Sequence, residues 1–566
     1  KPEKNNTRAN RTLKEKKKVK KKRLLAALLS AAMVVTMFAG CGTPGSKKSD
    51  DSSETEGTGK KRVTYTLRED IPSADPQNSN SISSASANIH MLACLTRNVE
   101  GEVRGDAAES WEVSDDGLVY TFHLRDGLKW SDGVDVTADD YVYGMQRLMD
   151  PAEACDYAFI GYILKNGAAV NNGEVSVEEL GVKALDDKTV EITLEHPAVY
   201  FESMASMCAL GPARRDLVEK YGKEYAADPE KAAYNGPFTM TEWKHGDQLV
   251  MTKNPDYWDA DSVKLDEICI KTVADAKTAV AMWENGEVDI TIVPTEMTEQ
   301  YADDSEFYFT GADDYIMLNQ SEGKLLANKN LRFALNYAIN RSEYNTLVNN
   351  DVYEPAQRLV LPNVTAADST YGERYPYEPF PLENDDAKAK EYLAAAMSEL
   401  GVSNAADIKL ELLTTDTEGA KKQAEVLQEQ FQKNLGITVE IKQVTYKQRL
   451  EMEQTKEYDM VVTGWVPDYS DAYSYLELWI SDGQYNHSGY NNPRYDELLE
   501  ASQFETDAAK RQDMLFEAEQ IFLGEDSALV PLQLRREQYL VNPKLENFNV
   551  YFVGYDFNLV YADLAE

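Results

Sequence analysis

The sequence lacks the short motifs by which most enzymes and cofactor-binding proteins are recognised. It has no Cys-x-x-Cys pair, no Gly-x-Ser-x-Gly elbow, no phosphate-binding loop and no dinucleotide fingerprint. Its five histidines are scattered, which gives no support to a zinc or haem site built from closely spaced histidines. We therefore expect no catalytic residue, no metal site and no cofactor. A secreted hydrolase is a remote alternative, because 97 acidic residues always allow a carboxylate pair to be proposed, but nothing marks one out.

Basic residues are scarce after the first forty positions. Residues 1–40 hold 12 Lys and Arg against 2 Asp and Glu, whereas residues 41–566 hold 46 against 95, a net charge of −49. Such an acidic body repels phosphate backbones, so we expect no nucleic-acid partner. The same charge attracts cationic ligands, although a solvated acidic surface without any ligand explains it equally well.

Long apolar runs are also scarce, and the clearest one lies near the amino end. Leu24–Phe38 follows the basic Lys20–Arg23 and precedes Ala39-Gly40-Cys41, which is the pattern of a secretory signal. A cysteine directly after Ala-Gly is typical of a lipoprotein signal, in which the thiol of Cys41 is acylated and becomes the mature amino terminus. The alternative is an uncleaved membrane anchor, for which the run is short. Either way, we expect the rest of the chain outside the cytoplasm, lipid-anchored to the cell membrane of a bacterium of the Gram-positive type.

Cysteine is otherwise rare. Cys94, Cys155, Cys208 and Cys269 can form two disulfides in an oxidising compartment, or they can be buried free thiols. Three pairings are open, so the sequence does not decide the disulfide state.

Folded structure is expected to begin after a flexible segment. Residues 41–61 are mostly Gly, Ser, Lys, Asp and Glu with almost nothing to bury, which indicates a tether. Arg62–Leu67 alternates like a strand, and Ile71–Ser84 has the composition of a polar loop. We expect helices over Ile89–Leu95 and Tyr141–Met149.

Strand and helix patterns alternate in the second half of the chain. Apolar positions have helical spacing over 385–400 and 419–435, whereas Ile408–Leu413, Ile437–Ile441 and Tyr458–Thr463 have the composition of strands. Such alternation is typical of a parallel α/β unit. We therefore expect an α/β lobe that the chain enters and leaves through another lobe, which is the arrangement of a clamshell binding protein.

The stretch Gly464–Asp471, directly after the last of these strands, has the composition of a binding turn. It combines an indole at Trp465, a rigid proline at Pro467 and a carboxylate at Asp468. A carboxylate pairs with an ammonium group, and an indole covers that group and excludes water. Open α/β sheets bind ligands at the carboxyl ends of their strands. The alternative is a surface turn whose Asp468 only caps the following segment Ala472–Leu478.

Several short phrases recur in one order along the chain. They are Ala108–Trp111, Leu124–Gly133, Thr137–Asp140, Gly181–Thr189, Asn235–Phe238, Lys253–Trp258, Gly286–Asp289, Arg332–Arg341, Gly464-Trp465 and Asp468-Tyr469. In this order they resemble the oligopeptide-binding family (extracellular solute-binding family 5), the peptide receptors of ABC transporters. The resemblance covers nearly everything from residue 62 to 566. Most of these phrases suit fold maintenance, and the positions that face a ligand are fewer.

The resemblance implies a fold of the α/β class, a two-lobed clamshell like that of periplasmic binding proteins, with two hinge crossings and an extra subdomain. The expected parts are a lipoprotein signal peptide at 1–40, a tether at 41–61, a first lobe built from 62–95, 201–312 and 529–566, an inserted subdomain at 96–200 and an α/β lobe at 313–528.

The resemblance also implies which residues meet a peptide. Asp468 occupies the place of the aspartate that pairs with the free amine of the peptide, and Gly464, Trp465 and Val466 would offer backbone groups. Tyr157 occupies the place of a ligand-contacting tyrosine, with ordinary packing as the alternative. The loop on the other side of the peptide is matched by Asn80, Ser81 and Ile82.

Two positions depart from the family pattern. Enterobacterial members have an acid at the place of Asn80, so here Asp468 alone would bring a formal charge to the amine. They have an arginine at the place of Val462, which helps to read the carboxylate of short peptides. Its replacement favours longer ligands or another cation.

The expected function is that of an extracellular, lipid-anchored and monomeric receptor that captures oligopeptides between two lobes and delivers them to the permease subunits of an ABC importer. Main-chain groups would bind the extended peptide, and hydrated pockets would accept varied side chains. The alternative within the same fold is a receptor for a nickel chelate, haem, an oligosaccharide or a signalling peptide.

Overall fold

A computed structural model describes residues 60–79, 81–99, 102–481, 483, 485–551, 553 and 557–565, all within one compact unit, Gly59–Glu566. Among these residues, the largest sheet has eleven strands of mixed direction. In order across the sheet they are β17 (Thr438–Val444), β16 (Lys409–Thr415), β18 (Met460–Trp465), β12 (Ser305–Leu318), β19 (Leu529–Val541), β11 (Ile290–Ile292), β1 (Arg62–Leu67), β10 (Glu267–Thr272), β9 (Gln248–Lys253) and β8 (Phe238–Lys244), with β13 (Glu354–Pro355) paired to β19 off this path.

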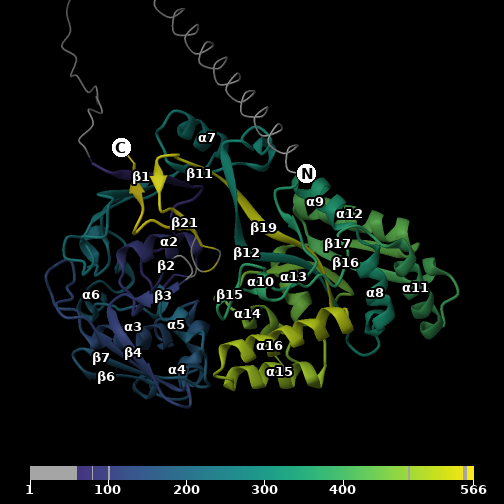
Figure 1. Ribbon diagram of the computed structural model, residues 1–566, viewed down its shortest axis with the longest axis horizontal. Coiled ribbons are helices and arrows are strands. Elements are labelled where there is room, and N and C mark those ends of the chain that lie inside the picture. Colours follow the sequence, from purple (N-terminus) through teal and green to yellow (C-terminus); the bar gives the residue numbers. More distant parts are fainter. Residues whose placement is uncertain are drawn as a thin grey trace, which may run out of the picture. The chain divides into compact units, whose positions relative to one another are not determined.

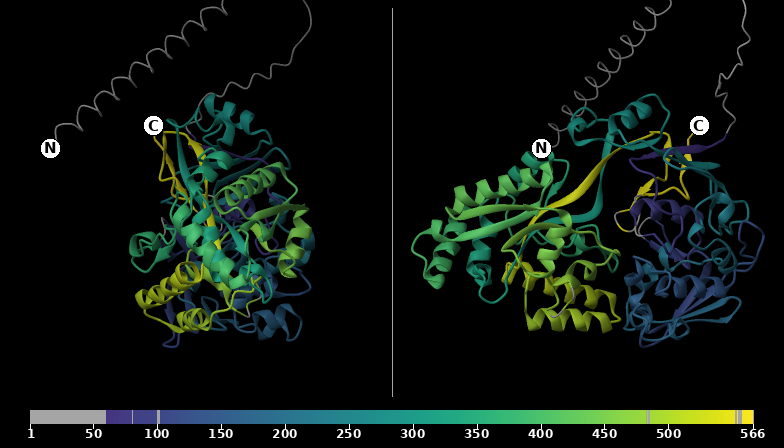
Figure 2. Two further views of the ribbon diagram at one scale, coloured as in Figure 1. Left: turned by 90° about the vertical axis from the view of Figure 1, so that its right-hand side faces the viewer. Right: turned by 180° about the vertical axis from the view of Figure 1, so that it is seen from behind.

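Two long strands, β12 and β19, join the two halves of this sheet. They run antiparallel and side by side (Figure 1), and Figure 2 shows the same pair from two further directions. β12 also pairs with β18, and β19 also pairs with β11. The β12–β19 register shifts between Phe309 and Asp313 and again between Asp314 and Tyr315, and such bulges bend and twist a strand pair. The chain passes from one half-sheet to the other through these two strands, in agreement with the two crossings expected from the sequence.

The half-sheet β17-β16-β18 is built as the sequence predicts. β16 pairs in parallel with both β17 and β18. Helix α12 (Glu418–Leu435) connects β16 to β17 and packs on both, and α13 (Tyr446–Gln454) connects β17 to β18. Leu427 and Phe431 of α12 are buried and lie four residues apart, as one apolar helix face requires. β18 continues through Gly464 to Trp465, so the binding turn starts at its carboxyl end.

A second sheet lies within the predicted insertion. Its four strands are antiparallel and carry the order β4 (Ala108–Val113), β5 (Val119–Leu124), β7 (Thr189–Thr193) and β6 (Val182–Asp186). Helix α3 (Ala138–Met149) packs on it and begins with a capping box, in which the backbone N–H of Thr137 donates to Oδ2 of Asp140 at 2.9 Å. The boundaries of the lobes themselves stay predictions.

The first helix of the described chain, α2, differs from the expectation. It runs over Ile82–Met91, not over Ile89–Leu95, and the preceding loop ends at Ser81. The side chain of Ser81 accepts a hydrogen bond from the backbone N–H of Ser84 at 3.1 Å and so caps the helix. The serine-rich composition of its first turns hides this helix, because serine is common both in loops and at helix caps.

The other helices surround these sheets, and smaller strand pairs complete the described chain. The helices are α4 (Gly167–Asn171), α5 (Phe201–Met204), α6 (Arg215–Tyr221), α7 (Ala276–Glu284), α8 (Lys329–Ala338), α9 (Arg341–Asn349), α10 (Tyr371–Arg374), α11 (Asp386–Leu400), α14 (Tyr473–Leu476), α15 (Pro493–Phe504) and α16 (Ala508–Glu519). The pairs are β2 (Thr96–Val99) with β3 (Glu102–Gly105), β14 (Thr365–Ala366) with β15 (Ser369–Thr370), β20 (Leu545–Glu546) with β23 (Asp563–Leu564), and β21 (Asn549–Val550) with β22 (Phe557–Asn558).

The four cysteines of the described chain are buried free thiols. Cys94, Cys155, Cys208 and Cys269 form no disulfide with one another. The sequence left open two disulfides or buried free thiols, and the structure has buried free thiols.

Candidate ligand site

The chain leaves β18 at a point where two strands come unusually close. Gly464 lies opposite Asp314 of β12, and a Cβ atom at Gly464 would lie 2.2 Å from the carbonyl oxygen of Asp313. Only glycine fits this position without movement of the backbone. The next residue, Trp465, donates its backbone N–H to Oδ1 of Asp313 at 3.1 Å. The turn after Trp465 therefore starts from a fixed position.

Asp468 lies in this turn and is partly buried. Its Oδ1 accepts a hydrogen bond from the hydroxyl of Tyr157 at 3.1 Å, and its backbone N–H donates to Oγ of Ser474 at 3.2 Å. Burial raises the pKa of Asp468 to about 6, although the Tyr157 hydrogen bond opposes this shift. The carboxylate is therefore ionised at neutral pH but is only weakly compensated, which is a favourable state for receiving a cation.

Tyr157 reaches Asp468 from a part of the chain 311 residues away. It directly precedes a short 3₁₀ helix (Ala158–Ile163), and its ring meets that of Phe159 edge-on at 5.0 Å between centroids. Burial raises its pKa, and the charge of Asp468 raises it further. The hydroxyl consequently keeps its proton and acts as a donor to the carboxylate.

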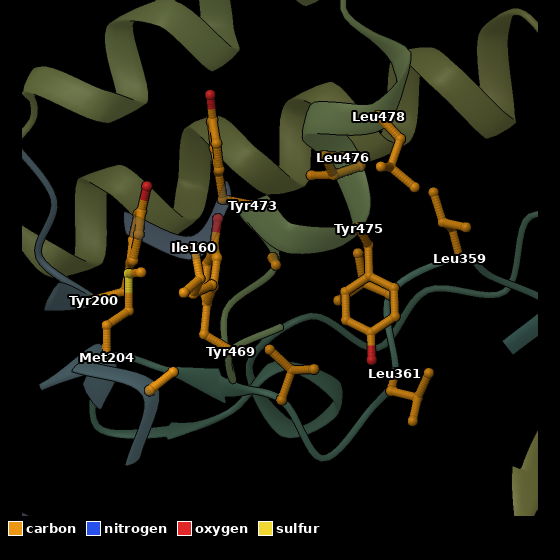
Figure 3. Packing of buried hydrophobic residues seen from close by; sticks show 14 of the residues in the cluster. Ile160, Tyr200, Met204, Leu359, Leu361, Tyr469, Tyr473, Tyr475, Leu476 and Leu478 are labelled. Carbon is orange, nitrogen blue, oxygen red and sulfur yellow. The ribbon is translucent and has the colours of Figure 1, made fainter. Parts of the chain in front are cut away.

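Aromatic packing holds the turn from the other side. The rings of Tyr469 and Tyr200 are parallel, with centroids 4.3 Å apart, and Figure 3 shows them beside Ile160. The hydroxyl of Tyr469 donates to Oε1 of Glu477 at 3.1 Å. Burial raises the pKa of Glu477 to about 8, and the charges of Asp468 and Asp471 act in the same direction. An unexpected second acid thus lies close to Asp468.

The backbone N–H of the first residue of α14, after the turn, is bound by a different aspartate than the one considered in the sequence. Asp471 accepts the backbone N–H of Tyr473 on its Oδ1 at 2.8 Å. The same carboxylate is buried and receives Arg511 at 2.6 and 3.0 Å and Gln512 at 3.1 Å. The carboxylate of Asp468 takes no part in these contacts, and Asp468 lines the cavity described next.

A cavity of about 310 Å³ lies at the turn, within the size range of small-ligand sites. Its lining comes from five separate stretches of the described chain. These residues are Pro76, Ser79, Ser81, Ile82, Ala85, Asn88, Ile89, Asn98, Tyr157, Ser203, Ser206, Met207, Cys208, Ala209, Val466, Pro467, Asp468, Tyr469, Ser470, Tyr551 and Val553. Most of the residues that line the cavity are therefore apolar or small. The lining also carries several hydroxyl groups and one carboxylate.

The structure brings together five of the eight residues that the resemblance placed at a ligand. Asp468, Val466, Tyr157, Ser81 and Ile82 all line the cavity. Gly464 and Trp465 are not among the described lining residues, because both are held in the sheet against β12. Asn80 and the proposed lipidation site Cys41 lie outside the described residues.

Sequence reasoning missed Asn88 and Glu477. Asn88 lies on α2, where the expected helix began one residue later. Glu477 had a usable signal, since it is the one charged residue in the largely apolar and aromatic run Tyr473–Ile480. An acid in such a run must either reach solvent or be buried with a partner.

The described residues contain no group of three or more His, Cys, Asp or Glu side chains arranged to hold a metal ion. None of the helices in the described ranges is both long and apolar enough to span a membrane.

A sequence profile of bacterial extracellular solute-binding proteins, family 5 Middle, matches residues 102–487. The chain belongs to this family. Dipeptide-binding protein DppE of Bacillus subtilis is 31% identical over 523 residues, which are 92% of this chain and 94% of DppE. The solved structure of Listeria monocytogenes OppA bound to peptide is 33% identical with a TM-score of 0.68, covering 90% of this chain and all of that one. The unliganded open form of MppA, a periplasmic murein tripeptide binding protein, is 25% identical with a TM-score of 0.77, covering 89% and 97%.

Two predictions are confirmed by these comparisons. The family-5 membership inferred from the ordered phrases is correct, and the fold is the α/β clamshell of that family. The family consists of extracellular solute-binding proteins rather than enzymes, so the protein acts outside the cytoplasm by binding a solute.

Proposed function

We propose that this family-5 protein captures oligopeptides at the cavity next to Asp468 and delivers them to the permease of an ABC importer. The compared proteins are named for a dipeptide, a bound peptide and a murein tripeptide. A structure matched over 90% of this chain is that of an oligopeptide ABC transporter's substrate-binding domain from Bacillus anthracis. These names support a peptide as the solute and an ABC permease as the partner.

The observation that carries the proposal is the placement of the Asp468 carboxylate. It lines a cavity of about 310 Å³ and is held by the Tyr157 hydroxyl at 3.1 Å. A partly buried carboxylate without a cationic partner in the cavity gains a charge-assisted hydrogen bond when an ammonium group binds. The amino terminus of a peptide supplies such a group.

The energy required is modest. A micromolar dissociation constant corresponds to about −8 kcal/mol. Hydrogen bonds to charged groups contribute about 1.5–3 kcal/mol each, and neutral ones about 1 kcal/mol. One ammonium–carboxylate contact and several main-chain hydrogen bonds, together with burial against Ile82 and Val466, reach this range.

Substitution of Asp468 tests the proposal. We expect Asp468→Ala to weaken binding of a pentapeptide with a free amine about 10- to 150-fold, as the loss of a hydrogen bond to a charged group implies. Calorimetric titration with the free and the N-acetylated pentapeptide measures this. The wild-type protein should prefer the free amine, and Asp468→Ala should abolish that preference with little change in melting temperature.

Asp407 provides a matched control, because it is exposed and lies at the end of the 3₁₀ helix Ala405–Asp407 rather than in the cavity lining. Asp407→Ala should bind both peptides as the wild type does. Equal affinities of the wild type for free and acetylated peptides would contradict the proposed role of Asp468.

We also propose that a lipid on Cys41 anchors the protein to the cell membrane, where the permease lies. The support is the sequence pattern Ala39-Gly40-Cys41 after an apolar run. Mass spectrometry of the mature amino-terminal peptide tests it, and an unmodified thiol at Cys41 would contradict it.

A further inference from the structure

Asn88 of α2 is a buried amide without a partner. The residue is 1% exposed, and its Nδ2 forms no hydrogen bond within the part of the chain that the structure describes. Nine in ten or more buried polar groups in proteins have a hydrogen-bond partner. An unpaired buried donor costs about 1–3 kcal/mol, so an acceptor that reaches Nδ2 from outside the chain would be stabilising.

Asn88 lies where such a partner would arrive. It lines the same cavity as Asp468. Ser81, Ala85 and Asn88 line it together, and a spacing of three to four residues places them on one face of α2. The cavity therefore has the carboxylate of Asp468 on the turn after β18 and the side chain of Asn88 on α2 in its lining.

The charge of the lining restricts what can bind between them. Among the lining residues that the structure describes, Asp468 carries the one formal charge at neutral pH, and its neighbours in the lining include the hydroxyls of Ser203, Ser206 and Ser470. A ligand carboxylate in this cavity would be removed from water without a cationic partner, which is costly. A peptide carbonyl is neutral and needs only a donor such as an amide.

The volume agrees with a short stretch of peptide. At about 310 Å³, the cavity lies within the size range of small-ligand sites and suits a few residues rather than a long chain. A neighbouring cavity of about 500 Å³ shares the side chain of Tyr551 and offers room for the continuing chain.

We propose that Asn88 is a ligand-binding residue whose Nδ2 donates to a backbone carbonyl of the peptide whose amine pairs with Asp468. The cavity thereby selects peptides whose carboxyl terminus lies outside the cavity or is amidated. The proposal rests on the proposed function, because it assumes a peptide amine at Asp468.

A first experiment compares Asn88→Ala with the wild type by calorimetric titration of a free-amine pentapeptide. We expect affinity to fall about 3- to 10-fold, the range of one neutral hydrogen bond. The melting temperature should be unchanged or higher, because the substitution removes an unpaired buried donor. Ser86→Ala is the matched control, since Ser86 is buried on the same helix and is not a lining residue.

A second experiment identifies the group that Asn88 contacts. In two pentapeptides, the first or the second peptide bond is replaced by a trans-alkene, which removes the carbonyl and keeps the shape. One of them should bind the wild type more weakly than the parent peptide, and that difference should vanish in Asn88→Ala. A structural role for Asn88 would leave the difference intact.

A third experiment tests the selection against a carboxylate. The wild type should bind an amidated alanyl dipeptide at least 10-fold more tightly than the free acid, while the amidated and free pentapeptides should differ little. Wild-type affinity in Asn88→Ala, or equal binding of the two dipeptides, would overturn this inference and leave the proposed function in place. Failure of every free-amine peptide to bind the wild type would instead overturn both.

Discussion

At the scale of single residues, the Asp468 carboxylate decides how binding depends on pH. Burial raises its pKa to about 6. The titratable groups close to it are Tyr157, whose pKa is raised by burial and by Asp468, Glu477, whose pKa is about 8, and Tyr485, whose pKa is also raised. All three are protonated and neutral between pH 5 and 7, so the change in this range belongs to Asp468.

We predict that peptide affinity falls in acid. Only the ionised form of Asp468 pairs with an ammonium group, so affinity should be nearly constant at pH 6.5–7.5 and fall about 10-fold per pH unit below the pKa of about 6. Titrations at pH 4.5, 5, 6 and 7 measure this. Asp468→Asn should bind weakly without an acid limb, and a wild-type affinity that stays flat to pH 4.5 would contradict the prediction.

The same pKa has the opposite effect on the stability of the ligand-free protein. A carboxyl group whose pKa is higher in the folded than in the unfolded chain favours folding when protonated. The contribution of Asp468 therefore becomes more favourable as the pH falls from about 6 toward its ordinary value of 3.8. Protonation of Asp468 in acid thus weakens ligand binding, whereas it makes the contribution of this residue to the stability of the empty protein more favourable.

At the scale of elements, a buried ion pair fixes the segment that carries Asp468. Asp471, at the end of the turn, accepts the backbone N–H of Tyr473 and pairs with Arg511 of α16 through hydrogen bonds of 2.6 and 3.0 Å. Both side chains are buried, at 7% and 2% exposure. The guanidinium also lies over the ring of Tyr200, which stacks on Tyr469.

We predict that Asp471→Ala destabilises the protein by about 3–5 kcal/mol, because it leaves the buried Arg511 charge without its partner. Urea unfolding followed by circular dichroism measures this. Glu517→Ala serves as the control, since it breaks an exposed pair with Arg494 and should cost about 1 kcal/mol or less. A loss of stability no larger than that of the control would show that the buried pair does not hold the segment.

At the scale of the whole molecule, the cavity joins stretches that lie far apart in the sequence. Its lining includes residues of 76–98, 203–209, 466–470 and 551–553, together with Tyr157. The strands β12 and β19 connect the two halves through backbone hydrogen bonds along most of their length. A ligand in the cavity consequently stabilises the folded arrangement of widely separated segments at once.

We predict that a saturating peptide raises the thermal unfolding transition of the wild type. At a free concentration of 100 times the dissociation constant, a ligand that binds only the folded protein adds about 2.7 kcal/mol. Differential scanning calorimetry with and without peptide measures the shift. Asp468→Ala at the same peptide concentration should show a much smaller shift, and an equal shift in both proteins would place the binding site elsewhere.

The sequence by itself determined the α/β class, the parallel unit β16-β18 with its helices, the family and the choice of Asp468 as the central candidate. These features depend on neighbours two to four residues apart and on motifs that are contiguous in the chain. The start of α2 at Ile82 was missed, because its serines suit a loop as well as a cap.

Only the tertiary structure decided the rest of the site. It brought Tyr157 to Asp468 across 311 residues, paired Asp471 with the backbone N–H of Tyr473 and buried the Nδ2 of Asn88 without a hydrogen-bond partner among the described residues. It also held Trp465 in the sheet rather than in the cavity lining. These outcomes depend on which distant surfaces meet and on how much water they exclude, and burial rather than composition sets the pKa of a carboxylate and the hydrogen-bonding needs of an amide.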